Sequence, residues 1–169
     1  EFIDVLNEHQ KAGRIKVFGV SNWTLERIEE ANNYAHNHGL TGLVAVSNNL
    51  ALAHMTDPVW GGCLHVSDTA SRAWLEQRQL PVMSWSSTSR GFFVYGDPND
   101  TSNTELVRSW YSKDNFLRLE RAKELARTRG VQPIQLALAW VLNQPFPTYA
   151  LIGPHTLEDL AISVDEIGR

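Results

Sequence analysis

Four short apolar segments, each separated from the next by a helical pattern, constrain the fold of this chain more than any other feature. Parallel strands need a crossover of about a dozen residues or more, whereas antiparallel strands can be joined by a tight turn. The spacing therefore predicts an α/β fold in which the four segments are neighbouring, parallel strands in chain order. These segments are Ile15 to Val20, Leu43 to Val46, Pro81 to Ser84 and Tyr149 to Ile152.

Residues typical of helix ends mark the segments between the strands. A side chain that accepts backbone N–H groups stands before each helical pattern, and Gly39 and Gly130 follow two of them. A first helix ends near Gly13, and Pro133 suits the first position of a helix that precedes the last strand. The expected N-terminal caps are Thr24, Ser67 or Asp68, Ser112 or Asp114, and the pair Thr156 and Asp159.

Two long segments lack a strand pattern. The stretch from Leu50 to Ser67 contains proline and several glycines, and its length favours a functional or covering loop over a tight connection. The stretch from Phe92 to Ser112 carries a run of turn residues followed by Trp110 and Tyr111. We interpret this second stretch as a flap with aromatic residues at its base.

Polar side chains follow each predicted strand, at the end of the sheet where ligands collect in α/β proteins. The segment after Pro81 to Ser84 is the richest, because hydroxyl groups and backbone amides surround Arg90, a composition that suits an anionic ligand. Trp85 is the first large apolar side chain among these polar residues. The alternative interpretation is a serine-rich loop whose tryptophan packs into the core.

Composition excludes several classes of protein. The 169 residues are 43% hydrophobic with a formal net charge of -4, which fits one globular domain. Because the 15 Lys and Arg are scattered, we expect no nucleic-acid partner. The lone Cys63 cannot form an internal disulfide, and there is no apolar run of about 18 residues or signal-like start, so we expect a cytoplasmic location and no membrane. Since Glu1 is not an initiator methionine, we expect a processed end or a longer chain.

No metal site is expected from the histidines and the cysteine. His36 and His38 are two positions apart on a predicted helix, a spacing that places them on different faces. His54, Cys63 and His65 share one loop, but no ligand spacing repeats and no fourth group accompanies them.

Four motifs, taken in their order and spacing, resemble the aldo-keto reductase family of NAD(P)H-dependent carbonyl reductases. The resemblance covers residues 1–169 as one domain and maps to the C-terminal half of the family's eight-stranded barrel. It implies half of a (β/α)8 TIM barrel, with four parallel strands and surrounding helices. The motifs are Gly19-Val20-Ser21-Asn22-Trp23, the turn from Trp85-Ser86 to Arg90-Gly91, the helix sequence from Gln132 to Leu142, and Leu151-Ile152-Gly153.

The resemblance implies a nicotinamide dinucleotide, NADP(H) or NAD(H), as the ligand of the polar strand ends. Ser21 and Asn22 would bind the nicotinamide carboxamide, and Ser47 aligns where the family usually has a glutamine with the same task. Trp85 would stack on the nicotinamide ring and share one face with Ser21, Asn22 and Arg90. The pyrophosphate would be lined by Ser86, Ser87, Thr88, Arg90 and Gly91, and the adenosine end would lie against Gly153 to Ser163.

The sequence departs from the family pattern in two respects. Asp159 aligns with an arginine that many members use to bind the 2′-phosphate of NADP(H), so the choice between the two cofactors stays open. The family's catalytic tyrosine, lysine, aspartate and histidine belong to the N-terminal half, which this sequence does not contain. We therefore identify no catalytic residue. The tyrosines of the chain match none of the family's positions, and they are Tyr34, Tyr95, Tyr111 and Tyr149.

Two functions from different classes remain open. The chain is either the cofactor-binding portion of an aldo-keto reductase-like oxidoreductase or a non-catalytic half-barrel that binds or assembles. Half a barrel exposes strand edges and an apolar face, so we expect a dimer or a complex with an N-terminal half-barrel. For the chain alone we expect weak dinucleotide binding and no carbonyl reductase activity. Some of the apolar strand residues must face the interior that further strands would close. The residues considered are Val17, Val44, Val46, Val82 and Ile152.

Overall fold

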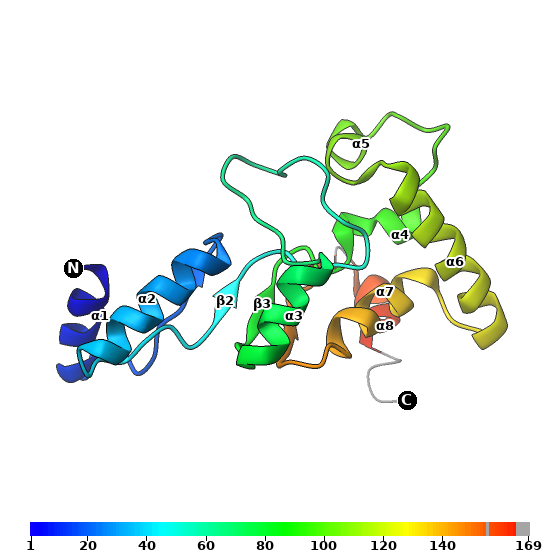
Figure 1. The fold of residues 1–169 in the computed structure, drawn as a ribbon. Coiled ribbons are helices and arrows are strands. Elements are labelled where there is room, and N and C mark those ends of the chain that lie inside the picture. Colours follow the sequence, from blue (N-terminus) through cyan, green and yellow to red (C-terminus); the bar gives the residue numbers. More distant parts are fainter. Residues whose placement is uncertain (155, 165–169) are drawn as a thin grey trace.

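The computed structural model describes residues 1–154 and 156–164, which form an α/β fold with one four-stranded sheet (Figure 1). The strands are β1 (Val20–Ser21), β2 (Val46–Ser47), β3 (Val82–Ser84) and β4 (Thr148–Ala150). The helices before β3 are α1 (Phe2–Lys11), α2 (Leu25–Asn37) and α3 (Thr69–Arg78). The later helices are the 3-10 helix η1 (Ser89–Gly91), α4 (Phe92–Tyr95), α5 (Thr104–Trp110), α6 (Lys113–Arg129), α7 (Pro133–Leu142) and α8 (Leu157–Val164).

The sheet confirms the predicted order and direction of the strands. Each neighbouring pair is parallel, in the order β1-β2-β3-β4. Regular pairing in β1 and β2 begins later than predicted, at Val20 and Val46. The segments already approach each other before these points, where the Val44 N–H donates to the Phe18 carbonyl at 3.0 Å.

The helix ends form as predicted from the sequence. The side chains of Thr24, Asp68 and Ser112 each accept a backbone N–H from the first turn of the helix that follows. At α8 the Thr156 N–H donates to Asp159 Oδ2 at 3.1 Å, and the Asp159 N–H donates to Thr156 Oγ1 at 3.0 Å. Of the two candidates named for α3 and for α6, Asp68 and Ser112 are therefore the capping residues.

One face of the sheet is covered by helices. Val46 and Val82 lie side by side in the register and are 1% and 0% exposed. They belong to one apolar cluster with Ile28 of α2, Leu75 of α3 and Val141 of α7. Val46 and Val82 therefore face the helices. Five strand residues were considered for a barrel interior, and these two do not point towards it.

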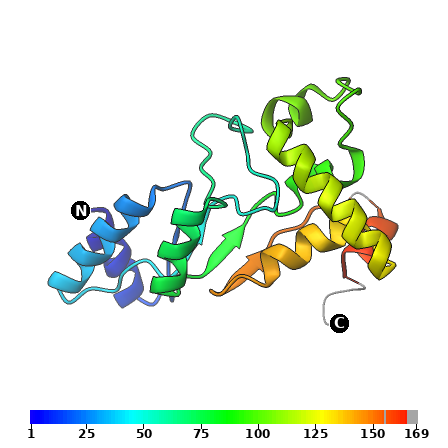
Figure 2. The same cartoon turned by 45° about the vertical axis from the view of Figure 1, so that its right-hand side comes forward.

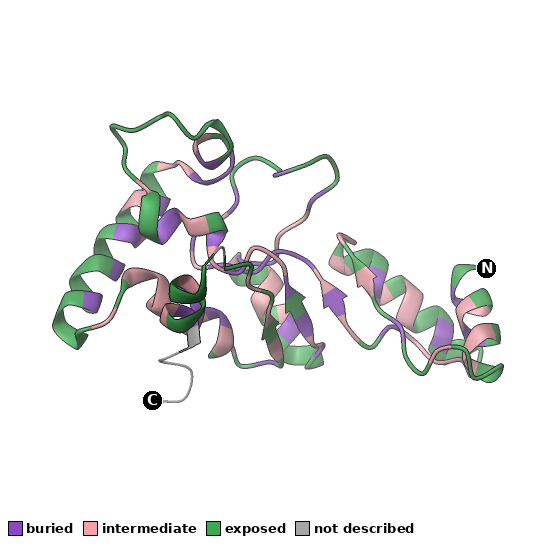
Figure 3. Cartoon of the chain, turned by 180° about the vertical axis from the view of Figure 1, so that it is seen from behind, coloured by how far each residue is buried: buried purple, intermediate pink, exposed green. Residues whose placement is uncertain are grey.

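The opposite face of the sheet is exposed. Met83 and Tyr149 pair in the register and are 43% and 59% exposed. Ser21 and Val17 are also exposed. Val44 is exposed too, but it lines the smaller cavity with residues of α2 and α3 and so does not lie on this open face. Figure 3, seen from behind, brings the strands forward with α3 behind them. Parallel sheets are almost always covered on both faces, so this exposed face is unusual for such a sheet.

A second core forms at the other end of the molecule from α1 and α2 (Figure 2). Phe92, Trp110, Leu119 and Ala137 are buried there and come from α4, α5, α6 and α7. The segment from Phe92 to Ser112 was predicted to be an irregular flap, but it contains α4 and α5. The expected aromatic base is present, because Trp110 is fully buried.

Asn115, at the start of α6, holds the long loop of residues 50–67 in place. Its Nδ2 donates to the carbonyl oxygens of His54 and Trp110, both at 2.7 Å, and its Oδ1 accepts the His54 N–H at 2.9 Å. The Asn115 side chain is fully buried. Buried backbone groups need partners, and the Asn115 side chain supplies three of them, two in the loop and one at the end of α5.

We predict that Asn115→Ala lowers the free energy of unfolding by roughly 2–4 kcal/mol, because buried groups left without partners cost about 1–3 kcal/mol each. Urea denaturation followed by circular dichroism measures this change. The control Asn99→Ala removes an exposed amide, and its effect should stay below about 0.5 kcal/mol. Equal losses in both variants would contradict this role for Asn115.

The same loop holds His54 next to His65, with their ring centroids 6.3 Å apart and 27° between the ring planes. Burial lowers the pKa of His54 to about 4, and the positive charges of Arg118 and His65 act in the same direction. The folded chain therefore keeps His54 neutral at pH values where a solvated imidazole takes up a proton.

We predict that folding stability falls as the pH drops from about 6.5 towards 4, because only the unfolded state protonates His54 over that range. Above about pH 6.5 His54 is neutral in both the folded and the unfolded state, so its ionisation no longer lowers the folding stability. In His54→Gln, the loss of stability between pH 7 and pH 5 should be smaller than in the wild type. His36→Gln, which removes an exposed imidazole, serves as the control. The prediction fails if both variants keep the wild-type pH dependence.

Candidate functional site

The loop that follows β3 has a strained backbone. Ser86, Ser89 and Arg90 have φ angles of 47°, 54° and 52°, and Gly91 has 85°. The left-handed region costs a non-glycine residue about 1–2 kcal/mol, and such strain is concentrated at functional sites. The turn is closed by the Ser89 N–H, which donates to the Ser86 carbonyl at 2.8 Å.

This loop is also fixed to the end of β4. Ser87 is fully buried and its Oγ donates to the Leu151 carbonyl at 2.8 Å. Ser89, Arg90 and Gly91 are left-handed in succession, and the N–H groups of Ser89 and Gly91 donate to the carbonyls of Ser86 and Thr88. The hydroxyl of Ser89 is buried and has no hydrogen-bond partner among the described residues.

A cavity of about 870 Å³ lies beside this loop. Its size is within the range of about 300–1,000 Å³ that is usual for small-molecule sites. It is bounded by the ends of β3 and β4 and by residues of α4 to α8. The predicted cofactor residues that line it are Trp85, Ser86, Thr88, Arg90, Gly91, Gly153 and Ser163. The segment expected at the adenosine end also includes His155, which lies outside the described residues.

Four predicted residues do not line this cavity. Ser87 is buried beneath the loop, while Ser21, Asn22 and Ser47 lie at the ends of β1 and β2. The Ser21 hydroxyl donates to the Ser47 carbonyl and the Ser47 hydroxyl donates to the Met83 carbonyl, both at 2.9 Å. Both hydroxyl protons are therefore already engaged between neighbouring strands.

Asn22 connects the end of β1 to the long loop. Its φ is 55°, and its Oδ1 accepts the Leu64 N–H at 3.0 Å. Its Nδ2 makes only a long contact of 3.4 Å with Ser21 Oγ. Asn22 therefore offers the Nδ2 group, a donor, to a ligand, while its oxygen holds the loop.

The residues that surround Trp85 were not predicted from the sequence. Trp60 of the long loop packs on Trp85 with ring centroids 5.1 Å apart, and Asn49 Nδ2 donates to the Trp85 carbonyl at 2.8 Å. Lys123 and Glu105 also line the cavity and were not predicted. The only signal for Trp60 was its place in a loop long enough to cover a site.

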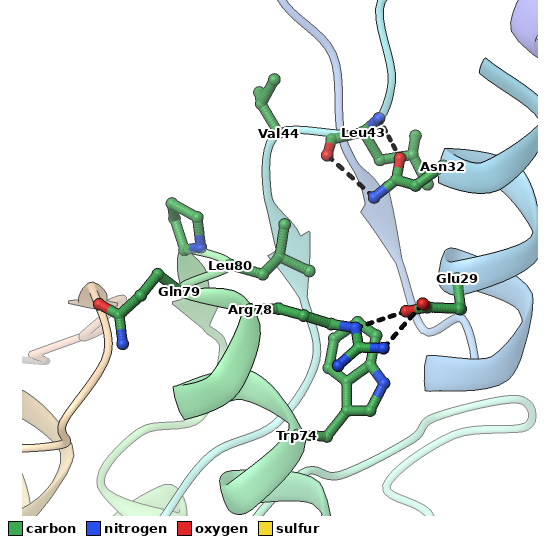
Figure 4. Close-up of a pocket in the computed structure, with 9 residues that line it drawn as sticks. Glu29, Asn32, Leu43, Val44, Trp74, Arg78, Gln79 and Leu80 are labelled. Carbon is green, nitrogen blue, oxygen red and sulfur yellow. Dashed lines mark hydrogen bonds and ion pairs between the residues drawn. The ribbon is translucent and has the colours of Figure 1, made fainter. Parts of the chain in front are cut away.

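A smaller cavity of about 400 Å³ lies between α2 and α3 (Figure 4). Arg78 donates to both carboxylate oxygens of Glu29, at 2.5 and 2.7 Å, and lies over the Trp74 ring at 4.7 Å. The hydrogen bond from Arg78 holds the pKa of Glu29 below its usual range. Because these polar groups already pair with one another, we interpret this cavity as a packing feature between the helices.

Within residues 1–154 and 156–164, no three His, Cys, Asp or Glu side chains gather as metal ligands. None of the helices in this part of the chain is both long enough and apolar enough to cross a membrane.

The residues present fit a nicotinamide dinucleotide in part. The strained loop lines the cavity with Ser86, Thr88 and the cation of Arg90, which suit a pyrophosphate, and Trp85 borders the same cavity. The fit is weaker at the carboxamide end, because Asn22 retains one group available to a ligand and the Ser21 hydroxyl proton is engaged. These residues would hold the cofactor at its phosphate and ring more firmly than at its carboxamide.

Comparison with known proteins gives a consistent result. Residues 1–167 match the Aldo/keto reductase family. The chain is 28% identical over 167 residues to "Protein tas" of Escherichia coli (strain K12), and the match covers 98% of this chain and 47% of that protein. It is 24% identical to "Uncharacterized oxidoreductase YrpG" of Bacillus subtilis (strain 168) and to "Versiconal hemiacetal acetate reductase" of Aspergillus parasiticus, each covering 99% of this chain and 48% of the relative. The chain thus spans about half the length of the curated relatives it matches.

Proposed function

This chain belongs to the aldo/keto reductase family, and we propose that it forms the dinucleotide-binding C-terminal half of a (β/α)8 barrel in an NAD(P)H-dependent carbonyl reductase. Its four parallel strands are half the number in such a barrel, and its relatives are about twice as long. One of these relatives carries the name of a reductase and another that of an oxidoreductase.

The cavity beside the strained loop is the observation that carries this proposal. It lies at the carboxyl ends of β3 and β4, where barrel enzymes bind their ligands. A single loop contributes an aromatic ring, hydroxyl groups and a guanidinium group to it, all within Trp85 to Gly91. This combination suits a ligand with a flat ring at one end and phosphates next to it.

The proposed roles follow from the positions of these groups. The bound dinucleotide supplies or accepts the hydride. The Trp85 ring would stack on the nicotinamide, the Arg90 guanidinium would offset the charge of the pyrophosphate, and Asn22 Nδ2 would donate to the carboxamide oxygen. Gly153 and Ser163 border the adenosine end. The acid that protonates the product alkoxide belongs to the part of the barrel that this chain does not form.

The exposed sheet face supports a second part of the proposal. Met83 and Tyr149 are placed to face a barrel interior that four further strands would close. Those strands come either from the rest of a longer polypeptide or from a second copy of this chain. If a second copy supplies them in the native protein, and not only when the chain is purified alone, the alternative function of a non-catalytic assembly module is favoured.

We predict that NADH or NADPH quenches the tryptophan fluorescence of the chain with micromolar or weaker affinity. Weak binding is expected because half of the walls of the site are absent and small ligands need enclosure. Trp85→Ala should remove the quenching, and circular dichroism should confirm that the variant is folded.

The matched control is Trp74→Phe, which alters a tryptophan at the smaller cavity and should leave the quenching in place. Quenching that persists in Trp85→Ala would count against the proposed site. Sub-micromolar affinity for the isolated chain would contradict the expected weakness.

A further inference from the structure

Four charged side chains line the larger cavity among the residues that the structure describes. Arg90 and Lys123 are positive, and Glu105 and Asp159 are negative. Their formal charges cancel. A site for a strongly anionic ligand normally carries an excess of positive charge, so this balance limits how much negative charge the cavity accepts.

Both positive side chains are already paired. Arg90 Nη2 lies 3.0 Å from Glu105 Oε2, and Lys123 Nζ lies 3.0 Å from Glu120 Oε1. Exposed ion pairs of this kind contribute about 0–1 kcal/mol, so a pyrophosphate can displace one at small cost. Each phosphate group that enters must nevertheless compete with a carboxylate already present.

Asp159 places a fixed negative charge on the cavity wall. Its carboxylate is oriented by the capping bond from the Thr156 N–H at 3.1 Å, in the first turn of α8. Asp159 is half-buried and lines the cavity together with Gly153 and Ser163, and the Ser163 hydroxyl donates to the Asp159 carbonyl at 2.8 Å. Under the proposed function this part of the cavity receives the adenosine end of the dinucleotide.

We propose that this cavity selects NAD(H) over NADP(H), and that Asp159 is the residue that determines the selection. This inference rests on the proposed function. NADP(H) differs from NAD(H) by a 2′-phosphate on the adenosine ribose, which adds up to about two negative charges near neutral pH. Near Asp159 that phosphate meets a carboxylate of like charge, and like charges at an interface are strongly unfavourable. We expect the chain to bind NADH about tenfold or more tightly than NADPH at low ionic strength.

Three variants separate the contribution of Asp159 from general charge effects. Asp159→Asn removes the charge but keeps an oxygen that accepts the Thr156 N–H, so the cap of α8 is retained. It should strengthen NADPH binding about threefold to tenfold and leave NADH binding nearly unchanged. Glu105→Gln frees Arg90 and should strengthen the binding of both nucleotides. Glu158→Gln, at an exposed neighbour that does not line the cavity, makes the same change in net charge and should alter neither affinity.

Isothermal titration with NADH and with NADPH at low salt measures both dissociation constants for each folded variant. Tighter binding of NADH, with a preference that narrows in Asp159→Asn but not in Glu158→Gln, supports the inference. NADPH binding as tight as NADH, or an unchanged preference in Asp159→Asn, overturns it and leaves the proposed function in place. If neither nucleotide binds to the wild type, the proposed function fails and the inference fails with it.

Discussion

A parallel sheet that is covered on one face only is the constraint on which the rest of this structure depends. Val82 is buried against the helices while its neighbour Met83, on the other face, is 43% exposed. Parallel strands are normally buried on both faces, because their crossover helices cover one face and other elements cover the second. Residues such as Met83 and Tyr149 are suited to a barrel interior, and in the 169-residue chain they remain at the surface. An open face of this kind is consistent with a chain that spans about half the length of its relatives.

The candidate site depends on the same sheet. β3 and β4 are adjacent, so the loops at their carboxyl ends meet, and the bond from Ser87 Oγ to the Leu151 carbonyl fixes one to the other. This anchoring supports the left-handed conformations of Ser89 and Arg90, which are unfavourable in isolation. The long loop adds a second support, because Trp60 packs on Trp85 and Asn115 holds the loop against α6. The site is thus formed by strained backbone that three separate parts of the chain keep in place.

The sequence predicted those features that depend on local pattern. The order of the strands follows from the helical patterns between them, and caps such as Thr24 and Ser112 follow from the hydroxyl groups that precede helices. The starts of β1 and β2 were predicted too early, because apolar character alone does not determine where regular pairing between strands begins. The left-handed conformation of Arg90 and its pairing with Glu105 have no sequence signal, since arginine rarely adopts that conformation and the two residues meet only in the folded chain.

The sedimentation coefficient of the purified chain at micromolar concentration tests most directly whether its open sheet face needs a cover. When no other protein is present, a second copy is the available cover, so a dimer or larger species is expected. Replacing both Met83 and Tyr149 by glutamate should give a monomer, because charge on this face opposes its burial. Leu157→Glu, at a side chain that is 86% exposed on α8, should leave the assembly unchanged. A compact wild-type monomer would contradict the account.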